Sequence, residues 1–168
     1  MSDRMEIRPA RVRDVRGIKA LIDHYAGKVV LGKDLVTLYE DVQEFWVAEA
    51  DGQVVGCGAL HVLWQDLAEI RTVAVDPMAK GRGIGHAIVE KLIETATELG
   101  LARIFVLTFE TGFFGRHGFV PIEDTPVPPE VYEEIRRSPD EGVAQFLDLA
   151  HVKPNTLGNT RMLLHLGA

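Results

Sequence analysis

The chain has 168 residues, of which 46% are hydrophobic and 26% charged, and its formal net charge at pH 7 is -7. This length and composition are typical of one soluble globular domain, here residues 1–168. The acidic balance, with no basic stripe to offset it, argues against general nucleic-acid binding. The single cysteine excludes an internal disulfide, and the sequence offers neither a signal peptide nor a membrane-spanning apolar run. We therefore expect a cytoplasmic protein without membrane contact.

The first third of the chain predicts a strand, two helices and a hairpin. A short strand at about Glu6–Pro9 precedes apolar residues at helical spacing from Val15 to Tyr25. Residues 32–43 predict a second helix, with Asp34 placed to cap its first turn. Two strands within residues 44–64 then flank Asp51-Gly52, a dipeptide that favours a tight hairpin turn.

The rest of the chain predicts a strand–helix–strand unit and a less regular tail. A strand covers about residues 68–75, and helical spacing from Ile84 to Leu99 is followed by Gly100, where a helix end favours positive φ. Residues 102–109 are continuously apolar, which indicates a central strand. A short helix within 125–137 and a strand at 161–166 close the chain. The predicted fold class is α+β.

The segment AKGRGIG, residues 79–85 and here called the glycine turn, places three glycines just before a helix. The first N–H groups of a helix have no internal acceptor and carry the positive end of its dipole, so an anion that can approach them is bound. Lys80 and Arg82 add positive side chains. On the residues alone, a phosphate site and a simple chain reversal are both open. A Walker P-loop lacks its Gly-Lys-Ser/Thr here, and His86 occupies the third glycine position of a Rossmann fingerprint.

Residues 73–92, VAVDPMAKGRGIGHAIVEKL, resemble the acyl-CoA-binding segment of the GNAT acetyltransferase superfamily, whose signature is Q/R-x-x-G-x-G/A. Lysine stands at the first signature position here. The resemblance implies a GNAT-type fold, with a mixed central sheet, a splayed strand pair and flanking helices, and acetyl-CoA as co-substrate without a metal. The pyrophosphate would bind the glycine turn, and the pantetheine arm the strand before it. The implied cofactor-binding residues are Val73, Ala74, Val75, Lys80, Gly81, Arg82, Gly83, Ile84, Gly85, His86 and Phe114.

The resemblance extends over nearly the whole chain. Residues 7–22, 56–63, 68–75 and 105–119 are similar to the acetyltransferase domain of N-acetylglutamate synthases, and the chain resembles their short stand-alone actinobacterial type. This implies acetylation of the α-amino group of L-glutamate or L-glutamine, the first step of arginine biosynthesis. The arginine-binding domain of the larger synthases is expected to be absent, which leaves arginine feedback open. A homodimer is expected from the superfamily.

Glu69 is the candidate general base, because it aligns with a glutamate of the synthases and shares a strand face with Arg71, Val73 and Val75 on the alternating pattern. The alternative is a solvated strand-end carboxylate paired with Arg71. Glu110, just past a strand end, is the second candidate base, and a helix-capping role is its alternative.

Two further catalytic needs are a polarised thioester carbonyl and a thiol that can leave. The backbone N–H of Val73 or its neighbour is the expected donor to the carbonyl. Many GNAT enzymes place an acid tyrosine where this chain has Phe113 and Phe114. A thiol with a pKa of about 8.5 can leave without a strict acid, so the phenylalanines are interpreted as core or pocket walls.

Basic residues are expected to bind the substrate carboxylates: Lys33, Arg71 and Arg161, together with Asn159. Each basic residue, taken singly, is more often an exposed surface charge. The synthases have a further cation where this chain has Gly32, and we therefore expect both glutamate and glutamine to be accepted.

Two other activities stay open on the sequence, a GNAT enzyme for a different amine and a non-catalytic acetyl-CoA sensor. The histidines show no metal-binding spacing, and His61 and Cys57 are interpreted as a satisfied strand residue and a small buried hydrophobe.

Overall fold

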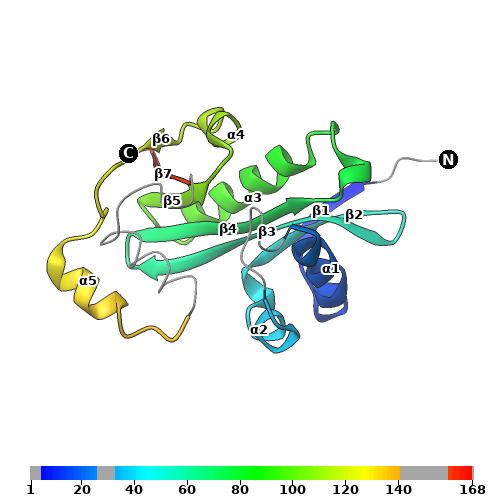
Figure 1. The fold of residues 1–168 in the computed structure, drawn as a ribbon, viewed down its shortest axis with the longest axis horizontal. Coiled ribbons are helices and arrows are strands. Elements are labelled where there is room, and N and C mark those ends of the chain that lie inside the picture. The colour runs from blue at the N-terminus through cyan, green and yellow to red at the C-terminus, as the bar shows by residue number, and fades with distance from the viewer. Residues whose placement is uncertain (1–4, 26–32, 141–158, 168) are drawn as a thin grey trace. The chain divides into compact units, whose positions relative to one another are not determined.

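The structure is a computed structural model that describes residues 5–25, 33–140 and 159–167. It divides into two compact units, one made of residues 1–61 and 70–99 and the other of residues 62–69 and 100–168. Seven strands are hydrogen-bonded in the order β1-β2-β3-β4-β5-β7-β6 (Figure 1). β4 pairs with β5 in parallel, whereas β1 with β2, β2 with β3, β5 with β7 and β6 with β7 are antiparallel. The sheet is therefore mixed, as predicted for a GNAT-type α+β fold.

The first unit carries most of the predicted first half and the helix after the glycine turn. Its elements are β1 (Met5–Pro9), η1 (Val12–Asp14), α1 (Val15–Tyr25), α2 (Leu35–Glu40), η2 (Val42–Glu44), β2 (Phe45–Ala50), most of β3 (Gln53–Trp64), the end of β4 (Leu67–Val75), η3 (Pro77–Ala79) and α3 (Ile84–Glu98). Asp51 and Gly52 both have positive φ, 51° and 80°, which confirms the predicted tight hairpin turn.

Helices cover both faces of the strands in the first unit. Cys57 and Ala59 of β3 are buried in a cluster with apolar residues of α1 and α2. A Cβ on Gly56 or Gly58 would lie 2.7 Å from Ile84 or 2.8 Å from Ile88, so α3 packs directly against the glycines of β3. Successive strand residues point to opposite faces. The strands thus lie between α1 and α2 on one side and α3 on the other, as Figure 1 shows.

The second helix is shorter than predicted. Instead of one helix over residues 32–43, α2 ends at Glu40, and η2 follows from Val42. Asp41 leaves the helical region with φ of -97° and ψ of 6°, because the chain turns there toward the start of β2 at Phe45. Asp34 does occupy the N-cap position of α2, but its side chain makes no capping hydrogen bond. The Gly32 position lies outside the described residues.

The second unit contains the start of β4 and the last elements of the chain. They are β5 (Arg103–Thr108), α4 (Thr111–Gly115), β6 (Val120–Pro121), α5 (Pro129–Ile135) and β7 (Thr160–His165). Its core gathers Leu67, Phe105 and Leu163 from three strands with Val127 and Ile135. β5 lies between β4 and β7, which confirms that the continuously apolar strand is central. The short strand β6 has no predicted counterpart.

Candidate acyl-CoA site

The glycine turn is open to solvent at the start of α3. Gly81 and Gly83 have φ of 87° and 73°, a region that L side chains rarely adopt, and an added Cβ on either would meet no heavy atom within 4 Å. The first bond inside α3 runs from the Ala87 N–H to the Gly83 carbonyl, at 3.0 Å. Earlier N–H groups of α3 precede this bond and have no acceptor inside the helix. The turn therefore combines helix N–H donors with free space in front of them.

The strand before the turn directs part of its backbone away from β3. The Asp76 N–H donates to the Val55 carbonyl of β3 at 2.8 Å. Backbone groups of successive strand residues point to alternate sides, so those of Val75 and Val73 are directed away from β3. On that side the Val75 carbonyl accepts a hydrogen bond of 2.6 Å from the Tyr25 hydroxyl. The predicted pantetheine-binding groups thus have a suitable direction, and one of them already has a protein partner.

The middle of β4 departs from regular strand geometry at Thr72, whose φ is 61°. A β-branched residue rarely takes this left-handed conformation. The left-handed Thr72 interrupts the regular alternation of side chains along β4. The prediction that Glu69 and Arg71 share a face with Val73 and Val75 therefore does not hold across Thr72. Parallel pairing of β4 with β5 covers three residue pairs and ends at Glu69 opposite Phe105, which is the pattern expected at the start of a splayed pair.

Glu69 is buried, with 7% of its surface exposed. The alternative of a solvated strand-end carboxylate is therefore wrong, because Glu69 lies inside β4 and has core residues as neighbours on either side, Ala68 and Ile70. Its role as a base stays a prediction.

Glu110 occupies a different environment in the second unit. It is the exposed N-cap residue of α4, and its N–H donates to the Thr108 hydroxyl at 2.8 Å. Its side chain makes no capping hydrogen bond, so the capping alternative is wrong for the carboxylate, although the Glu110 carbonyl accepts from the Phe114 N–H. The geometry leaves the Glu110 carboxylate at the surface.

Phe114 belongs to an aromatic cluster of the second unit. Its buried ring meets Phe113 edge-on at 5.0 Å between centroids and Phe119 at 5.4 Å. This packing agrees with the interpretation of the phenylalanines as core residues. Contact of Phe114 with the cofactor stays a prediction.

The predicted substrate-binding residues are not ordinary surface charges. The Lys33 side chain is 7% exposed, and its Nζ lies 4.0 Å from Oδ2 of Asp41. Arg161, on β7, is buried and donates to the Glu123 carbonyl. The alternative that each is an exposed surface charge is therefore wrong for Lys33 and for Arg161. Lys33 and Arg71 belong to the first unit, and Arg161 to the second, as does half-buried Asn159. Their convergence on one substrate stays a prediction.

The remaining polar residues of β3 have structural partners. His61 Nδ1 lies 2.8 Å from Oε2 of Glu44, as expected for a satisfied histidine. Cys57 is fully buried, and burial raises the pKa of its thiol to about 12. Its Sγ lies 3.4 Å from the Thr72 carbonyl. Cys57 is thus the inert, buried side chain that the sequence predicted.

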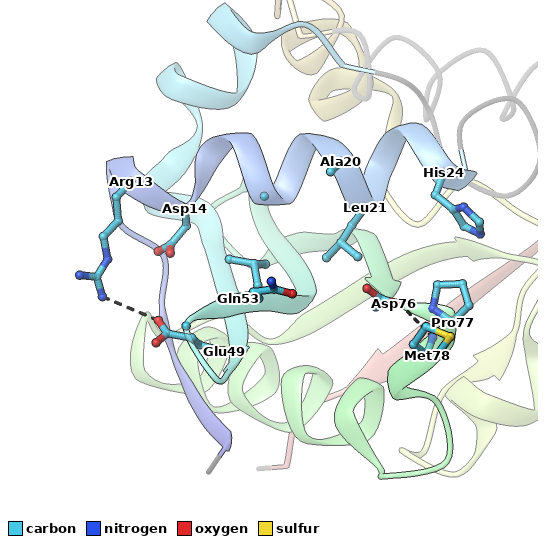
Figure 2. A pocket seen from close by; sticks show the side chains of 13 residues that line it. Arg13, Asp14, Ala20, Leu21, His24, Glu49, Gln53, Asp76, Pro77 and Met78 are labelled. Atoms are coloured by element: carbon cyan, nitrogen blue, oxygen red, sulfur yellow. Dashed lines mark hydrogen bonds and ion pairs between the residues drawn. The ribbon is translucent and has the colours of Figure 1, made fainter. Parts of the chain in front are cut away.

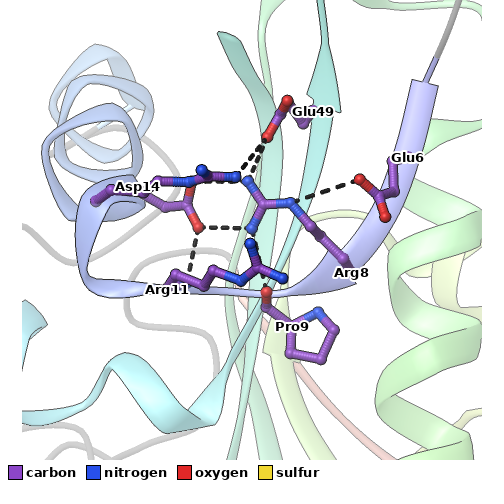
Figure 3. Close-up of polar contacts among 7 residues, drawn as sticks. Glu6, Arg8, Pro9, Arg11, Asp14 and Glu49 are labelled. Carbon is purple, nitrogen blue, oxygen red and sulfur yellow. Dashed lines mark hydrogen bonds and ion pairs between the residues drawn. The ribbon is translucent and has the colours of Figure 1, made fainter. Parts of the chain in front are cut away.

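An ion network that the sequence analysis did not predict joins β1, η1 and β2 (Figure 3). Arg8 donates from Nη1 and Nη2 to the Asp14 carboxylate at 2.7 and 2.9 Å, and from Nη2 also to Glu49. The Arg11 N–H donates to Asp14 as well, at 2.7 Å. These contacts lower the pKa of Asp14 and raise that of Arg8. Arg8 and Asp14 are opposite charges only six positions apart, so their pairing could have been predicted from the sequence. Glu49 is 41 positions from Arg8, and its contact could not.

A groove of about 880 Å³ lies on the same unit, beside α1, the β2–β3 hairpin and η3 (Figure 2). Ala20, Leu21 and His24 line it from α1, and Pro77 and Met78 from η3. No residue of the glycine turn lines it. Among the described residues, no helix is both long and apolar enough to cross a membrane.

Sequence comparisons agree with this geometry. The model of the acetyltransferase (GNAT) family matches residues 19–119, more than half of the chain. An amino-acid acetyltransferase of Mycobacterium tuberculosis is 66% identical over 163 residues, which cover 95% of this chain and 94% of the relative. An amino-acid acetyltransferase of Aeromonas salmonicida is 32% identical over 79% of this chain, but the match covers only 31% of that longer protein.

Solved structures extend the comparison to the fold. A Mycobacterium tuberculosis protein crystallised with CoA and a second ligand has a TM-score of 0.91 at 65% identity, over 96% of this chain and 99% of that one. N-acetylglutamate synthase of Neisseria gonorrhoeae, complexed with coenzyme A and N-acetyl-glutamate, has a TM-score of 0.76 at 25% identity, over 100% of this chain and 36% of the synthase. On these matches, and on the glycine turn that precedes α3, the chain belongs to the GNAT acetyltransferase family.

Proposed function

We propose that this protein transfers the acetyl group of acetyl-CoA to the α-amino group of a free amino acid, L-glutamate or L-glutamine. The observation that carries the proposal is the 66% identity to an amino-acid acetyltransferase over nearly the full length of both chains. The relative crystallised with CoA, at 65% identity, supports the co-substrate.

The glycine turn fits the pyrophosphate of acetyl-CoA. Gly81 and Gly83 lack the side chains that would fill the space before the α3 N–H groups, and the turn is exposed. Lys80 and Arg82 add positive charge next to these N–H groups, which compensates the phosphate charge in a protein of net charge -7. Backbone groups of Val73 and Val75, directed away from β3, would bind the pantetheine arm as an added strand does.

The transfer forms a bond from the amine nitrogen to the acetyl carbon and breaks the carbon–sulfur bond, so that the thiol is released. Buried Glu69 would accept the proton that the amine loses. The Val73 N–H, fixed in β4, would donate to the carbonyl oxygen on which negative charge develops. Lys33, Arg71, Asn159 and Arg161 are the proposed partners of the substrate carboxylates.

The acceptor assignment has direct support in one relative and stays open between two amino acids. The Neisseria gonorrhoeae synthase is complexed with N-acetyl-glutamate. Lys33 is already near Asp41. By the resemblance to the synthases, a further cation would be expected where this chain has Gly32. A site with less positive charge discriminates less against the neutral amide, so both glutamate and glutamine are proposed substrates.

The metabolic step and the cellular compartment of the reaction are also part of the proposal. We infer the first step of arginine biosynthesis, carried out in the cytoplasm by a single acetyltransferase domain. A second Neisseria gonorrhoeae synthase structure contains L-arginine, and this chain covers 34% of that protein.

The proposal is tested by CoA release from acetyl-CoA with the full chain and a panel of free amino acids. Release with glutamate or glutamine is the expected result. If both are inert at millimolar concentration while another amine reacts, the substrate is wrong and the family assignment stands. Thermal stabilisation by CoA without release for any amine would favour a sensor.

The assignment of the base is tested by Glu69→Gln. The amide cannot accept the proton, and kcat should fall by about 10²–10⁴-fold with little change in KM for acetyl-CoA. Glu110→Gln, at the surface, is the matched control and should retain kcat within a factor of two or so. The opposite pattern would transfer the role of base to Glu110.

A further inference from the structure

Tyr25 is the last residue of α1, and its side chain is half-buried against the core of the first unit. Its position in the sequence predicted only a packing role in the helix. In the structure it contacts both parts of the proposed cofactor site in the first unit, the end of β4 and the glycine turn. The two contacts come from different atoms of the side chain, so each can be tested separately.

The first contact is made by the hydroxyl. It donates to the Val75 carbonyl at 2.6 Å, on the side of β4 that is directed away from β3. The Asp76 N–H, in the same peptide plane, donates to the Val55 carbonyl, so the tyrosine hydroxyl adds a second restraint on this peptide unit from its other side. The two bonds together fix a backbone group that a pantetheine amide would use. A carbonyl oxygen has two lone pairs, and a tyrosine hydroxyl can itself accept a bond, so the contact leaves acceptor capacity for a ligand N–H.

The second contact is made by the ring. Nζ of Lys80 lies 5.5 Å from the centroid of the Tyr25 ring, a distance at which a cation is attracted to the ring face. Lys80 is the first residue of the GNAT signature in this chain and is otherwise an exposed side chain on a turn. The ring therefore restrains a long cationic side chain of the glycine turn.

We propose that Tyr25 is a positioning residue for acetyl-CoA, with the hydroxyl holding the Val75 carbonyl for the pantetheine arm and the ring holding Lys80 for the pyrophosphate. The inference rests on the proposed use of acetyl-CoA. It assigns to the end of α1 a part in cofactor affinity, while the acetyl transfer itself is left to β4.

The test separates the two contacts with two ligands and two variants. Affinities are measured by calorimetry for CoA and for 3′-phospho-ADP, the nucleotide end of CoA that lacks pantetheine. Tyr25→Phe keeps the ring and removes the hydroxyl, so CoA should bind roughly three- to tenfold more weakly, the range for one lost hydrogen bond, while 3′-phospho-ADP binds as in the wild type. Tyr25→Leu should weaken both ligands.

Kinetics and a matched control complete the test. For Tyr25→Phe, KM for acetyl-CoA should rise by the same factor with kcat nearly unchanged. Tyr39→Phe, on the exposed side of α2, removes a hydroxyl of the same type and should change neither ligand. If Tyr25→Phe binds CoA as tightly as the wild type or more tightly, the hydroxyl does not position the cofactor and the inference is overturned. Failure of the wild type to bind CoA would instead refute the proposed function.

Discussion

The first unit has two charged regions, the glycine turn and the ion network of Arg8, Asp14 and Glu49. They differ in whether the charges are paired inside the protein or face open space. In the ion network, Arg8 is 6% exposed and its carboxylate partners Glu6, Asp14 and Glu49 all come from the protein. In the glycine turn, Lys80 and Arg82 are exposed next to helix N–H groups, and the space before Gly81 and Gly83 is open. The comparison indicates that charge satisfied inside the protein serves folding, whereas donors left facing open space serve a ligand.

The strongest expected effect concerns the ion network. Asp14→Ala removes the bidentate partner of Arg8 and leaves a buried guanidinium with Glu49 and the more distant Glu6, so unfolding free energy should fall by about 3–5 kcal/mol. Urea unfolding measures the change. Affinity of the remaining folded protein for CoA should be retained, because Asp14 is not part of the glycine turn.

Asp23→Ala is the matched control for this variant. Asp23 of α1 pairs with Lys19 at 3.0 Å, but its side chain is 53% exposed. Such surface pairs contribute about 0–1 kcal/mol. Equal losses for the two aspartates would show that burial of the network contributes nothing, and the comparison with the glycine turn would fail.

The next effect concerns the glycine turn. Gly83→Val puts a branched side chain into the open space before the α3 N–H groups, and kcat/KM for acetyl-CoA should fall by about 10²-fold, as for loss of a strong hydrogen bond to a charged group. Steady-state kinetics at varied acetyl-CoA measures it.

Gly100→Val provides the control at the other end of α3. Gly100 has φ of 86° and equally open space around its missing Cβ, so the backbone strain of roughly 1–3 kcal/mol is comparable. Only stability should suffer there. Similar losses of kcat/KM in both variants would mean that strain, and not a blocked phosphate site, explains the first result.

The smallest effect is a pH dependence of stability. The ion network lowers the pKa of Asp14, so the unfolded chain binds the proton more readily than the folded one. The stabilisation is therefore present above the unfolded pKa of about 3.9 and is lost as the pH falls below it toward the folded pKa. Unfolding free energies of wild type and Asp14→Ala, measured from pH 7 down to pH 2, should differ by a constant amount above about pH 4 and by a shrinking amount below it. A constant difference across that range would contradict the assignment.

Features set by neighbouring residues could be predicted from the sequence. The hairpin at Asp51-Gly52, the helix end at Gly100 and the glycine turn each depend on a few adjacent residues whose backbone preferences agree. The turn was the most informative of them, since its glycines, the helix after it and a family signature coincide.

Features that depend on distant partners could not be predicted. Glu49 meets Arg8 across 41 positions, and Tyr25 meets Val75 across 50. Neither residue type carries a local signal for such a contact. The left-handed Thr72 is a stronger case, because a β-branched residue within an apolar strand predicts regular extended backbone. This one residue interrupts the alternation that was expected to place Glu69 and Arg71 on one face with Val73 and Val75.

The burial of Cys57 has a practical consequence for measuring the reaction. It is the chain's one cysteine, and at a pKa of about 12 it is almost wholly protonated at neutral pH, inside a core that a disulfide reagent cannot enter. Chromogenic disulfides should therefore react with liberated coenzyme alone. Turnover can be followed continuously and counted stoichiometrically, and a burst of colour from the enzyme itself would report that its native structure has opened.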